Sequence, residues 1–471
     1  MRPALVLLIL PVLVAGCAAE APSAPTTAPS SGDRTSSAAA SVAMAWPSVP
    51  PAPEGDLAPD VAAAVDRLVA DFGPGRVDRD ALGVVAGSGD PRLAWLIGDL
   101  LRFTPPGDGE AALRDAFTSL TRVDPLTDGP FGSVPWVAAA NLLIGWDLPA
   151  PPGYREAKAT VFLAVEPAWE PFFRDPDATI DWRWVSWGGV LIDDRPRGDG
   201  SPCRGGCIPG LDDPTLTDAA GGDWYADWRP VFGVEIGGEP VAFPRNVMEV
   251  HEMVNLTIGG RRIGLPYCTL CASAQAYLID TVPGADGPLL LRTSGLLSRS
   301  NKLMYDLGTW SAFNTFTGRA TSGPLLDSGV VLEQVPVVAT SWGEWKAAHP
   351  ATRIVARDGG IGMAYPDDPL EGRDEAGPIF PIGQVDPRLP AQHRVVGTIG
   401  PAGPVAFPVE EALAALEAGE TVRVGEVEAA RGSGGLRIRM VSGGELPAHP
   451  AFWFAWSQFH PGTALWAPPG S

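Results

Sequence analysis

The first folded stretch of the chain has the hydrophobic spacing of amphipathic helices. Apolar residues recur at steps of three and four from Leu57 to Phe72, which places them on one face of a helix. The same period returns in four further stretches, at residues 90–101, 111–120, 136–144 and 155–165. These patterns predict a helical domain over residues 57–169, and no catalytic set is evident within it.

After residue 170 the pattern changes to shorter apolar runs separated by glycine and proline. Val231–Pro244 aligns without a gap on Val395–Pro408, and Gly237 and Gly238 stand between two apolar runs of the first copy. A Gly-Gly pair in this position indicates a β-hairpin, because both turn residues need a positive φ. We therefore predict an α+β fold class, in which the N-terminal helical domain is followed by a β-rich mixed domain over residues 170–471 with two similar hairpin units.

The N-terminus reads as an export signal. Arg2 precedes an apolar run that is too short to span a bilayer, and Val14-Ala15-Gly16-Cys17 resembles a bacterial lipobox. The resemblance implies that residues 1–16 are a lipoprotein signal peptide and that Cys17 carries the lipid. An ordinary signal peptide cleaved nearby is the alternative. We expect an extracytoplasmic protein, anchored to the cell membrane or envelope through its lipid.

Residues 17–56 are predicted to form a disordered tether. They are mostly Ala, Pro, Ser and Thr, with few large apolar side chains. Such a segment buries too little surface to offset the entropy lost on ordering. Its expected role is to hold the folded part away from the membrane.

Composition narrows the classes of function. The chain has 471 residues, and 34 Lys and Arg against 55 Asp and Glu give a formal net charge of −21. This charge repels phosphate backbones, so we expect no nucleic-acid partner. The length allows two or three domains and a large core. A zinc-protease helix, a nucleophile elbow, a phosphate loop and a dinucleotide fingerprint are absent from the sequence.

The most chemically suggestive residues follow the first hairpin copy. His251 precedes a second Gly-Gly pair, Gly259-Gly260, and Cys268 and Cys271 follow it. A hairpin turn at the glycines would fold the strand bearing Cys268 back towards His251. The second copy has no cysteine, so this polar set belongs to one copy only. The remaining four histidines are interpreted as structural.

Several segments from here to the C-terminus, read together, resemble one bacterial family, the domain-of-unknown-function family DUF3179. The segments are His251-Glu-Met-Val-Asn255, Tyr267-Cys-Thr-Leu-Cys271, Ser294-Gly-Leu-Leu297, Asn301-Lys-Leu-Met-Tyr-Asp306, Phe316-Thr-Gly318, Trp342-Gly-Glu-Trp345 with His349-Pro350, and Phe452-Trp-Phe-Ala-Trp456 with His460-Pro461. The resemblance covers about residues 201–466 and implies an extracytoplasmic protein without an assigned reaction. Thr269, Ala272 and Phe313 depart from the family pattern, which has Pro, Gly and Trp there.

These segments define the candidate site. Its residues are His251, Glu252, Asn255, Tyr267, Cys268, Cys271, Ser294, Asn301, Tyr305 and Asp306. Polar side chains in an otherwise apolar stretch either orient a ligand or satisfy buried backbone groups.

Three chemistries fit this set. His251, Cys268 and Cys271 could bind a soft metal ion such as Cu(I) or Zn, and Cys203 and Cys207 could complete a four-sulfur site. The Cys268 and Cys271 pair could instead exchange between dithiol and disulfide, as in a thiol-disulfide oxidoreductase. In the third interpretation the four cysteines form two local disulfides in a structural or interaction module, whose helical domain docks a protein partner.

Overall fold

The structure is a computed structural model that describes residues 46–468, except residues 74, 75, 130, 200, 202, 204, 375 and 376. Pro47–Ser471 forms one compact unit. The predicted signal peptide, the lipidation site Cys17 and the tether up to residue 45 lie outside the described residues.

The N-terminal part of the compact unit is helical, as the apolar spacing predicts. Its helices are α1 (Pro59–Ala70), α2 (Arg79–Gly87), α3 (Ala94–Phe103), α4 (Asp108–Thr121), α5 (Pro135–Trp146), α6 (Tyr154–Val165) and α7 (Glu170–Arg174), with 3-10 turns η1 (Pro91–Leu93) and η2 (Pro167–Trp169). Side-chain caps define three of the starts, one of them η2, where the Glu166 side chain accepts a hydrogen bond from the amide of Ala168. The Asp78 side chain accepts hydrogen bonds from the first turn of α2, and that of Asp90 does the same for η1.

Residues 47–56, which the prediction assigns to the tether, contact the helices. The carbonyl of Pro47 accepts a hydrogen bond from Trp146 Nε1 at 2.7 Å, and that of Gly55 accepts one from Arg92 Nη1 at 2.9 Å. The segment has neither helix nor strand. The path of these residues is therefore fixed by contacts with helical side chains.

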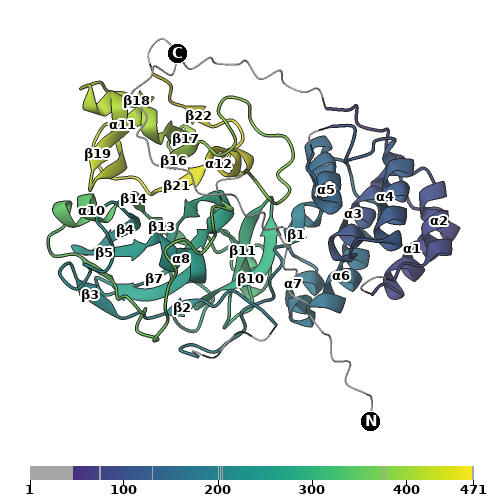
Figure 1. Cartoon of the computed structure of the whole chain (residues 1–471), viewed down its shortest axis with the longest axis horizontal. Coiled ribbons are helices and arrows are strands. Elements are labelled where there is room, and N and C mark those ends of the chain that lie inside the picture. The colour runs from purple at the N-terminus through teal and green to yellow at the C-terminus, as the bar shows by residue number, and fades with distance from the viewer. Residues whose placement is uncertain are drawn as a thin grey trace, which may run out of the picture. The chain divides into compact units, whose positions relative to one another are not determined.

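The rest of the chain is β-rich, and the mixed helix and strand content confirms the predicted fold class (Figure 1). The described strands form five sheets. The first runs β1 (Val185–Trp187), β10 (Leu291–Ser298), β11 (Asn301–Asp306), β12 (Ala312–Asn314). The second runs β13 (Glu333–Val335), β9 (Ala276–Leu278), β7 (Arg261–Cys268), β6 (Met253–Ile258), β2 (Leu211–Asp212), with β8 (Ser273–Ala274) paired to β7.

The remaining three sheets include both copies of the repeated sequence. The third runs β14 (Val338–Ser341), β4 (Pro230–Ile236), β5 (Glu239–Pro244), β15 (Arg353–Val355), β3 (Leu216–Asp218). The fourth runs β21 (Ala448–Phe452), β16 (Arg394–Gly400), β17 (Gly403–Pro408), β22 (Ala464–Leu465). The fifth runs β18 (Val422–Val424), β19 (Val427–Gly432), β20 (Gly435–Met440). Short helices follow several strands: α8 (Arg245–His251), α9 (Pro324–Asp327), α10 (Trp342–Ala348), α11 (Val409–Glu417) and α12 (Trp453–Phe459).

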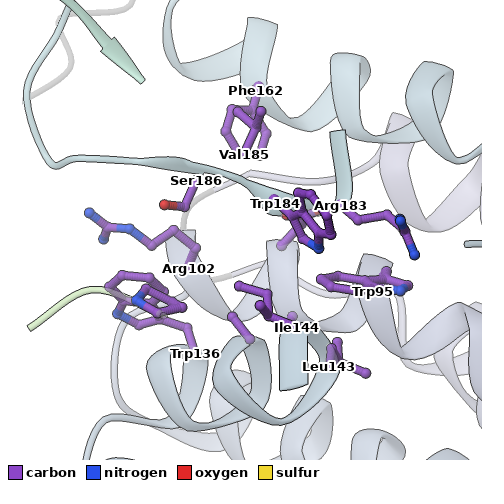
Figure 2. A pocket seen from close by; sticks show the side chains of 14 residues that line it. Trp95, Arg102, Trp136, Leu143, Ile144, Phe162, Arg183, Trp184, Val185 and Ser186 are labelled. Atoms are coloured by element: carbon purple, nitrogen blue, oxygen red, sulfur yellow. The ribbon is translucent and has the colours of Figure 1, made fainter. Parts of the chain in front are cut away.

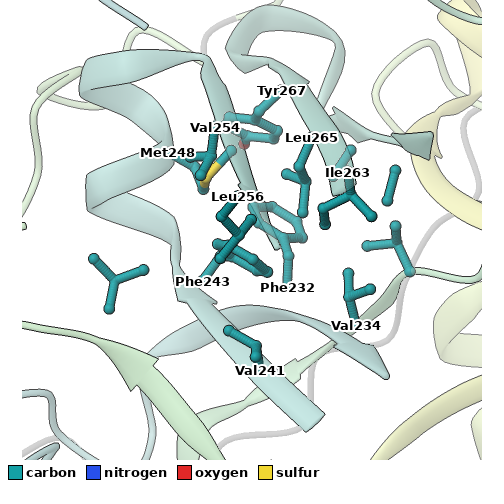
Figure 3. Close-up of a cluster of buried hydrophobic side chains, with 14 of the residues drawn as sticks. Phe232, Val234, Val241, Phe243, Met248, Val254, Leu256, Ile263, Leu265 and Tyr267 are labelled. Atoms are coloured by element: carbon teal, nitrogen blue, oxygen red, sulfur yellow. The ribbon is translucent and has the colours of Figure 1, made fainter. Parts of the chain in front are cut away.

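Two hairpins pack face to face to make the central core (Figure 3). Gly237 and Gly238 connect β4 to β5, while Gly259 and Gly260 connect β6 to β7, and all four glycines have positive φ. The side chains between the hairpins are apolar and almost fully buried, and include Phe232, Val234, Phe243, Leu256 and Leu265. This core fixes the strand β7, at whose end the cysteines stand.

Helix α6 and the turn η2 contact strands β1 and β10 of the first sheet. Lys158 Nζ donates to the carbonyl of Val185 at 2.7 Å, and Trp169 Nε1 donates to that of Ser294 at 2.7 Å. A narrow cavity lies beside this contact, between Arg102, Trp136 and Trp184 (Figure 2). Its volume of about 30 Å³ leaves room for little more than a water molecule.

Among the described residues, none of the helices combines the length and the apolar content that crossing a bilayer requires.

Candidate dithiol site

The cysteine pair stands where β7 leaves the central core. Strand β7 ends at Cys268, the 3-10 turn η4 (Thr269–Cys271) follows, and Cys268 pairs with Ser273 of β8 on the way back. Ala272 closes the turn with a φ of 45°. We call residues 268–273 the dithiol loop and its two cysteines the dithiol. Both thiols are free, and Cys268 is 4% exposed while Cys271 is fully buried.

A tight turn between β10 and β11 places a carbonyl group against both sulfurs. The carbonyl oxygen of Ser300 lies 3.1 Å from Cys271 Sγ and 3.8 Å from Cys268 Sγ. Arg299 and Ser300 form this turn with φ values of 50° and 67°. Such left-handed backbone is uncommon outside glycine, so surrounding contacts must hold the turn in place.

The two thiols differ in acidity. A hydrogen bond from the Cys271 thiol lowers the pKa of Cys268, with help from the charge of Lys302 and its backbone amide. Burial raises the pKa of Cys271 well above the usual range, and the neighbouring Cys268 adds to the rise. Cys268 therefore loses its proton more readily than Cys271, and it is also the more exposed residue of the two.

A buried ion pair flanks the dithiol. Lys302 Nζ lies 2.8 Å from Glu252 Oε2, and the two side chains are 4% and 13% exposed. The same ammonium donates to the carbonyls of Glu252 at 2.6 Å and Tyr267 at 3.0 Å, while Thr269 Oγ1 donates to Glu252 Oε1 at 3.0 Å. These bonds tie the start of the dithiol loop to the end of helix α8.

Two polar atoms beside the sulfurs have no hydrogen-bond partner among the described residues. They are Asn301 Oδ1 and Ser300 Oγ, and both side chains are almost fully buried. Asn301 Nδ2 donates to Ser273 Oγ at 3.1 Å, and the Asn301 side chain also lowers the pKa of Cys271 against the larger effect of burial. Unpaired buried polar atoms are rare and costly, so any account of this site has to explain these two.

His251 does not join the cysteines, which corrects the predicted three-ligand metal site. Its Nδ1 lies 2.7 Å from the carbonyl oxygen of Pro209 and its Nε2 lies 2.7 Å from the hydroxyl of Tyr365. Among the described residues, no three metal-binding side chains that include Cys268 or Cys271 come within 4.8 Å of one another. The backbone explains the difference: Glu252 has a φ of 52°, and the side chain that reaches the dithiol loop belongs to Glu252, next in sequence.

The other predicted site residues make structural contacts. Asn255 bonds to both backbone groups of Leu291, and Ser294 Oγ bonds to backbone groups of the β10 and β11 hairpin. Tyr305 OH donates to the carbonyl of Asp193 at 2.7 Å. Asp306 accepts backbone hydrogen bonds from Leu290, just before β10, and from Thr309 in the turn that follows it. Of the ten candidates, the structure thus gathers Glu252, Tyr267, Cys268, Cys271 and Asn301.

The second cysteine pair is a disulfide between Cys203 and Cys207. Asp193 lies within 4.8 Å of both sulfurs, and these three form the only compact group of metal-binding side chains among the described residues. The Asp193 oxygens already accept hydrogen bonds from Arg195 and from the backbone of Gly210. The predicted four-sulfur site is therefore not assembled, because Cys203 and Cys207 are bonded to each other.

Another histidine, His449, contacts the residue Gln275 that follows the dithiol loop. Gln275, just after the loop, lies with its Nε2 3.4 Å from His449 Nδ1, and its Oε1 has no partner among the described residues. Burial lowers the pKa of His449 to about 3, so this imidazole is neutral at ordinary pH. Local sequence patterns do not predict this contact, because 174 residues separate Gln275 from His449.

A cavity of about 200 Å³ opens next to the dithiol loop. Tyr267 and Ala272, which flank the dithiol in sequence, form part of its wall together with Arg245, Arg394 and apolar residues of β4, β14, β16 and β21. The loop itself packs against the buried cluster that contains Phe316. Neither Cys268 nor Cys271 lines this cavity, so the dithiol loop meets it through Tyr267 and Ala272.

The comparison with protein families identifies the family of this chain. Residues 205–442 match the family described as "Protein of unknown function (DUF3179)", so the chain belongs to that family. The match includes the dithiol loop, Glu252 and Lys302. The curated proteins yielded no match, and neither did the solved structures.

Proposed function

We propose that this protein is a thiol-disulfide redox protein whose reactive centre is the dithiol. One observation carries the proposal: two free cysteines with pKa values shifted in opposite directions share one short loop. Thiol-disulfide exchange by a dithiol requires these two roles: an acidic thiol that attacks the substrate and a second, protonated thiol that later resolves the mixed disulfide.

The reaction proceeds in two substitutions at sulfur. The Cys268 thiolate attacks one sulfur of a substrate disulfide, which forms a mixed disulfide and releases the other substrate sulfur as a thiolate. Cys271 then passes its proton to the substrate thiolate released in the first step and attacks Cys268, so the second substrate thiolate leaves and a Cys268–Cys271 disulfide forms. Two electrons pass from the dithiol to the substrate, and the reverse sequence oxidises a substrate dithiol.

The surrounding residues support the first step more than the second. The Lys302 ammonium and backbone amide stabilise negative charge on Cys268, while Glu252 opposes it. The Ser300 carbonyl accepts from the protonated Cys271 thiol and so favours its resting state. Asn301 is placed to donate to a Cys271 thiolate once it forms, since its side chain lowers the Cys271 pKa.

Trapping the mixed disulfide tests this function. The Cys271→Ser variant should retain a disulfide-linked adduct with a small aromatic disulfide such as dithiobis-nitrobenzoate, whereas the wild type should release it and become internally oxidised. Cys203→Ser with Cys207→Ser is the matched control and should behave as the wild type does. Absence of any adduct at Cys268 in the folded Cys271→Ser protein would reject the redox proposal.

Binding of Cu(I) by the dithiol is the second candidate. Two adjacent thiolates suit the two-coordinate geometry that soft Cu(I) accepts, whereas a structural Zn site needs four ligands. The described residues supply no third ligand, which favours Cu(I) over Zn. Competition with the chromogenic chelator bicinchoninate under reducing conditions measures this affinity, and Cys268→Ser should abolish it.

We further propose that the mature protein is lipid-anchored at Cys17 and works outside the cytoplasm. The lipobox-like sequence before Cys17 supports the anchor, and the Cys203–Cys207 disulfide suits an oxidising compartment. Metabolic labelling with a radioactive fatty acid should mark the wild type and leave Cys17→Ala unlabelled.

We also infer that the β-rich region holds two copies of one unit. In support, the hairpins β4-β5 and β16-β17 each have an antiparallel neighbour on one side and a parallel neighbour on the other, although the sheet that holds β4-β5 carries one further strand, β3. Trp345 Nε1 donates to Thr352 Oγ1 at 2.8 Å in one sheet, and Trp456 Nε1 donates to Thr463 Oγ1 at 2.9 Å in the other. The shared residues serve the fold, and the dithiol, which has no counterpart, carries the chemistry.

A further inference from the structure

A polar cleft adjoins the cavity beside the dithiol loop and shares Trp228, Pro230 and Arg245 with it. It has a volume of about 470 Å³ and is lined by residues 224–230, by the first turns of helix α8 and by the segment 367–374. Its size falls within the range of small-molecule sites. None of the dithiol residues lines it.

Carboxylates dominate the cleft. Four of them, from Glu249, Asp367, Asp368 and Asp374, face two guanidinium groups, those of Arg229 and Arg245. The guanidinium of Arg245 bonds to Glu249 Oε1 at 2.6 Å and also to Asp374, while that of Arg229 bonds to Asp367 at 2.5 Å. Asp368 accepts only backbone hydrogen bonds among the described contacts. The described lining therefore carries an excess of negative charge.

An exposed tryptophan stands at the edge of this acidic lining. Trp228 is 78% exposed, far more than any other large apolar residue among those described. Single exposed apolar residues need no explanation, but an indole beside several carboxylates is the combination that binds organic cations. The ring of Tyr225 adds a buried aromatic wall, against which Arg229 already stacks at 4.4 Å.

An unpaired acceptor in the wall points to a ligand that donates hydrogen bonds. Asn246 is 1% exposed and its Nδ2 donates to the carbonyl of Pro366 at 2.9 Å, but its Oδ1 has no partner among the described residues. A buried amide oxygen without a donor is costly. Together with the surplus carboxylates, it calls for a ligand rich in N–H or polarised C–H donors.

The geometry argues against a bare metal ion. No three carboxylates of the cleft come within 4.8 Å of one another among the described residues. Divalent cations such as Ca²⁺ need several oxygens at short range. A larger cation, whose charge is spread over an organic group, suits carboxylates that are further apart.

We propose that this cleft binds an organic ammonium ion, with the charged nitrogen among the carboxylates of Glu249, Asp368 and Asp374 and its apolar substituents on the indole of Trp228. This site is separate from the dithiol and does not depend on the redox proposal. The chemical class includes quaternary ammonium compounds, amino alcohols and polyamines.

The acidity of Glu249 makes the affinity depend on pH. Burial raises the pKa of Glu249 to about 7, and the charges of Asp374 and Asp368 add to the rise while Arg245 opposes it. Protonated Glu249 therefore weakens the attraction for a cation below neutral pH, and ionised Glu249 strengthens it above. The other charged groups that face the site, Arg229 and Asp367, are paired with each other.

Binding of choline, ethanolamine and spermidine to the full mature chain tests the proposal, with tryptophan fluorescence and calorimetry as the readouts. The neutral isostere 3,3-dimethyl-1-butanol, in which carbon replaces the charged nitrogen of choline, is the matched ligand control. We expect at least one cation to bind at least tenfold more tightly than the isostere and to bind more tightly at about pH 8 than at about pH 6.

Variants separate the cleft from non-specific binding. Trp228→Ala and Asp368→Asn should each weaken the cation about tenfold or more, and Glu249→Gln should remove the pH dependence. Ile399→Ala, which alters another exposed apolar side chain outside the cleft, is the control and should bind as the wild type does. The proposal is overturned if none of the three cations binds at millimolar concentration, if the isostere binds as well, or if folded Trp228→Ala keeps the wild-type affinity.

Discussion

Replacing Lys302 by Met should destabilise the protein and make Cys268 less acidic. The substitution keeps the length of the side chain and removes a charge that lies 2.8 Å from Glu252 Oε2, together with hydrogen bonds to the carbonyls of Glu252 and Tyr267. Both partners of the pair are nearly buried, so the Glu252 carboxylate is left without a counter-charge. Losing one partner of a buried pair costs about 3–5 kcal/mol of unfolding free energy.

A double variant tests the same reasoning from the other side. With Glu252→Gln added, no buried charge is left unpaired, so the double variant should be more stable than Lys302→Met alone. The effects on acidity are opposite for the two single variants, because Lys302 lowers the pKa of Cys268 and Glu252 raises it. Lys302→Met should therefore raise that pKa, and Glu252→Gln should lower it further.

Urea denaturation and the pH dependence of alkylation measure these two effects. Lys346→Met is the matched control, since Lys346 pairs with Asp227 on the surface and its loss should cost under about 1 kcal/mol. The reasoning is refuted if Lys302→Met costs no more than this control and leaves the alkylation profile of Cys268 unchanged.

Three more predictions concern the scaffold. Gly233→Ala should cost roughly 1–3 kcal/mol or more in urea denaturation, because a Cβ there would overlap the Trp345 ring, and a wild-type midpoint would contradict this packing. The folded-state pKa of His449 is lowered from 6.5 to about 3, so the stability that neutral His449 contributes is complete above about pH 6.5 and is lost as the pH falls. The free energy of unfolding should therefore drop by on the order of 3 kcal/mol between about pH 7 and about pH 4.5. The drop should be smaller in His449→Gln. Reducing the Cys203–Cys207 disulfide, or replacing both residues by Ser, should cost only about 2 kcal/mol in thermal or urea unfolding because the closed loop is short, and complete unfolding would show a larger role.

The sequence pattern predicted those helices and turns whose conformation is determined by residues close together in the chain. The apolar spacing from Leu57 to Phe72 contains α1, and the Gly-Gly pair at 259–260 stands in the turn between β6 and β7. These features follow from local rules of helix facing and turn conformation. The helix and strand content of each half of the chain was therefore predictable.

Which side chains form the site depends on the local backbone conformation and on segments that are distant in the sequence. The hairpin does bring residues 251–253 beside the end of β7, since the amide of Tyr267 donates to the carbonyl of Glu252 at 2.9 Å. Glu252 has a left-handed φ although it is neither Asn nor Gly, so no local sequence signal favoured its side chain over that of His251 as the one that reaches the dithiol loop. Lys302 lies within the segment Asn301–Asp306 that resembles the family, but a lysine in a strand is ordinarily solvent-exposed, so its burial beside the dithiol was not predictable from the sequence.

The pH dependence of alkylation at each cysteine tests the central claim most directly. The reduced wild-type protein would be treated with iodoacetamide over a range of pH, and peptide mass spectrometry would report the rate at Cys268 and Cys271 separately. The account predicts that Cys268 reacts first and with a pKa below that of an ordinary thiol, while Cys271 stays unreactive until well above it. Equal rates with an ordinary thiol pKa at both sulfurs would contradict the assignment of an attacking and a resolving cysteine.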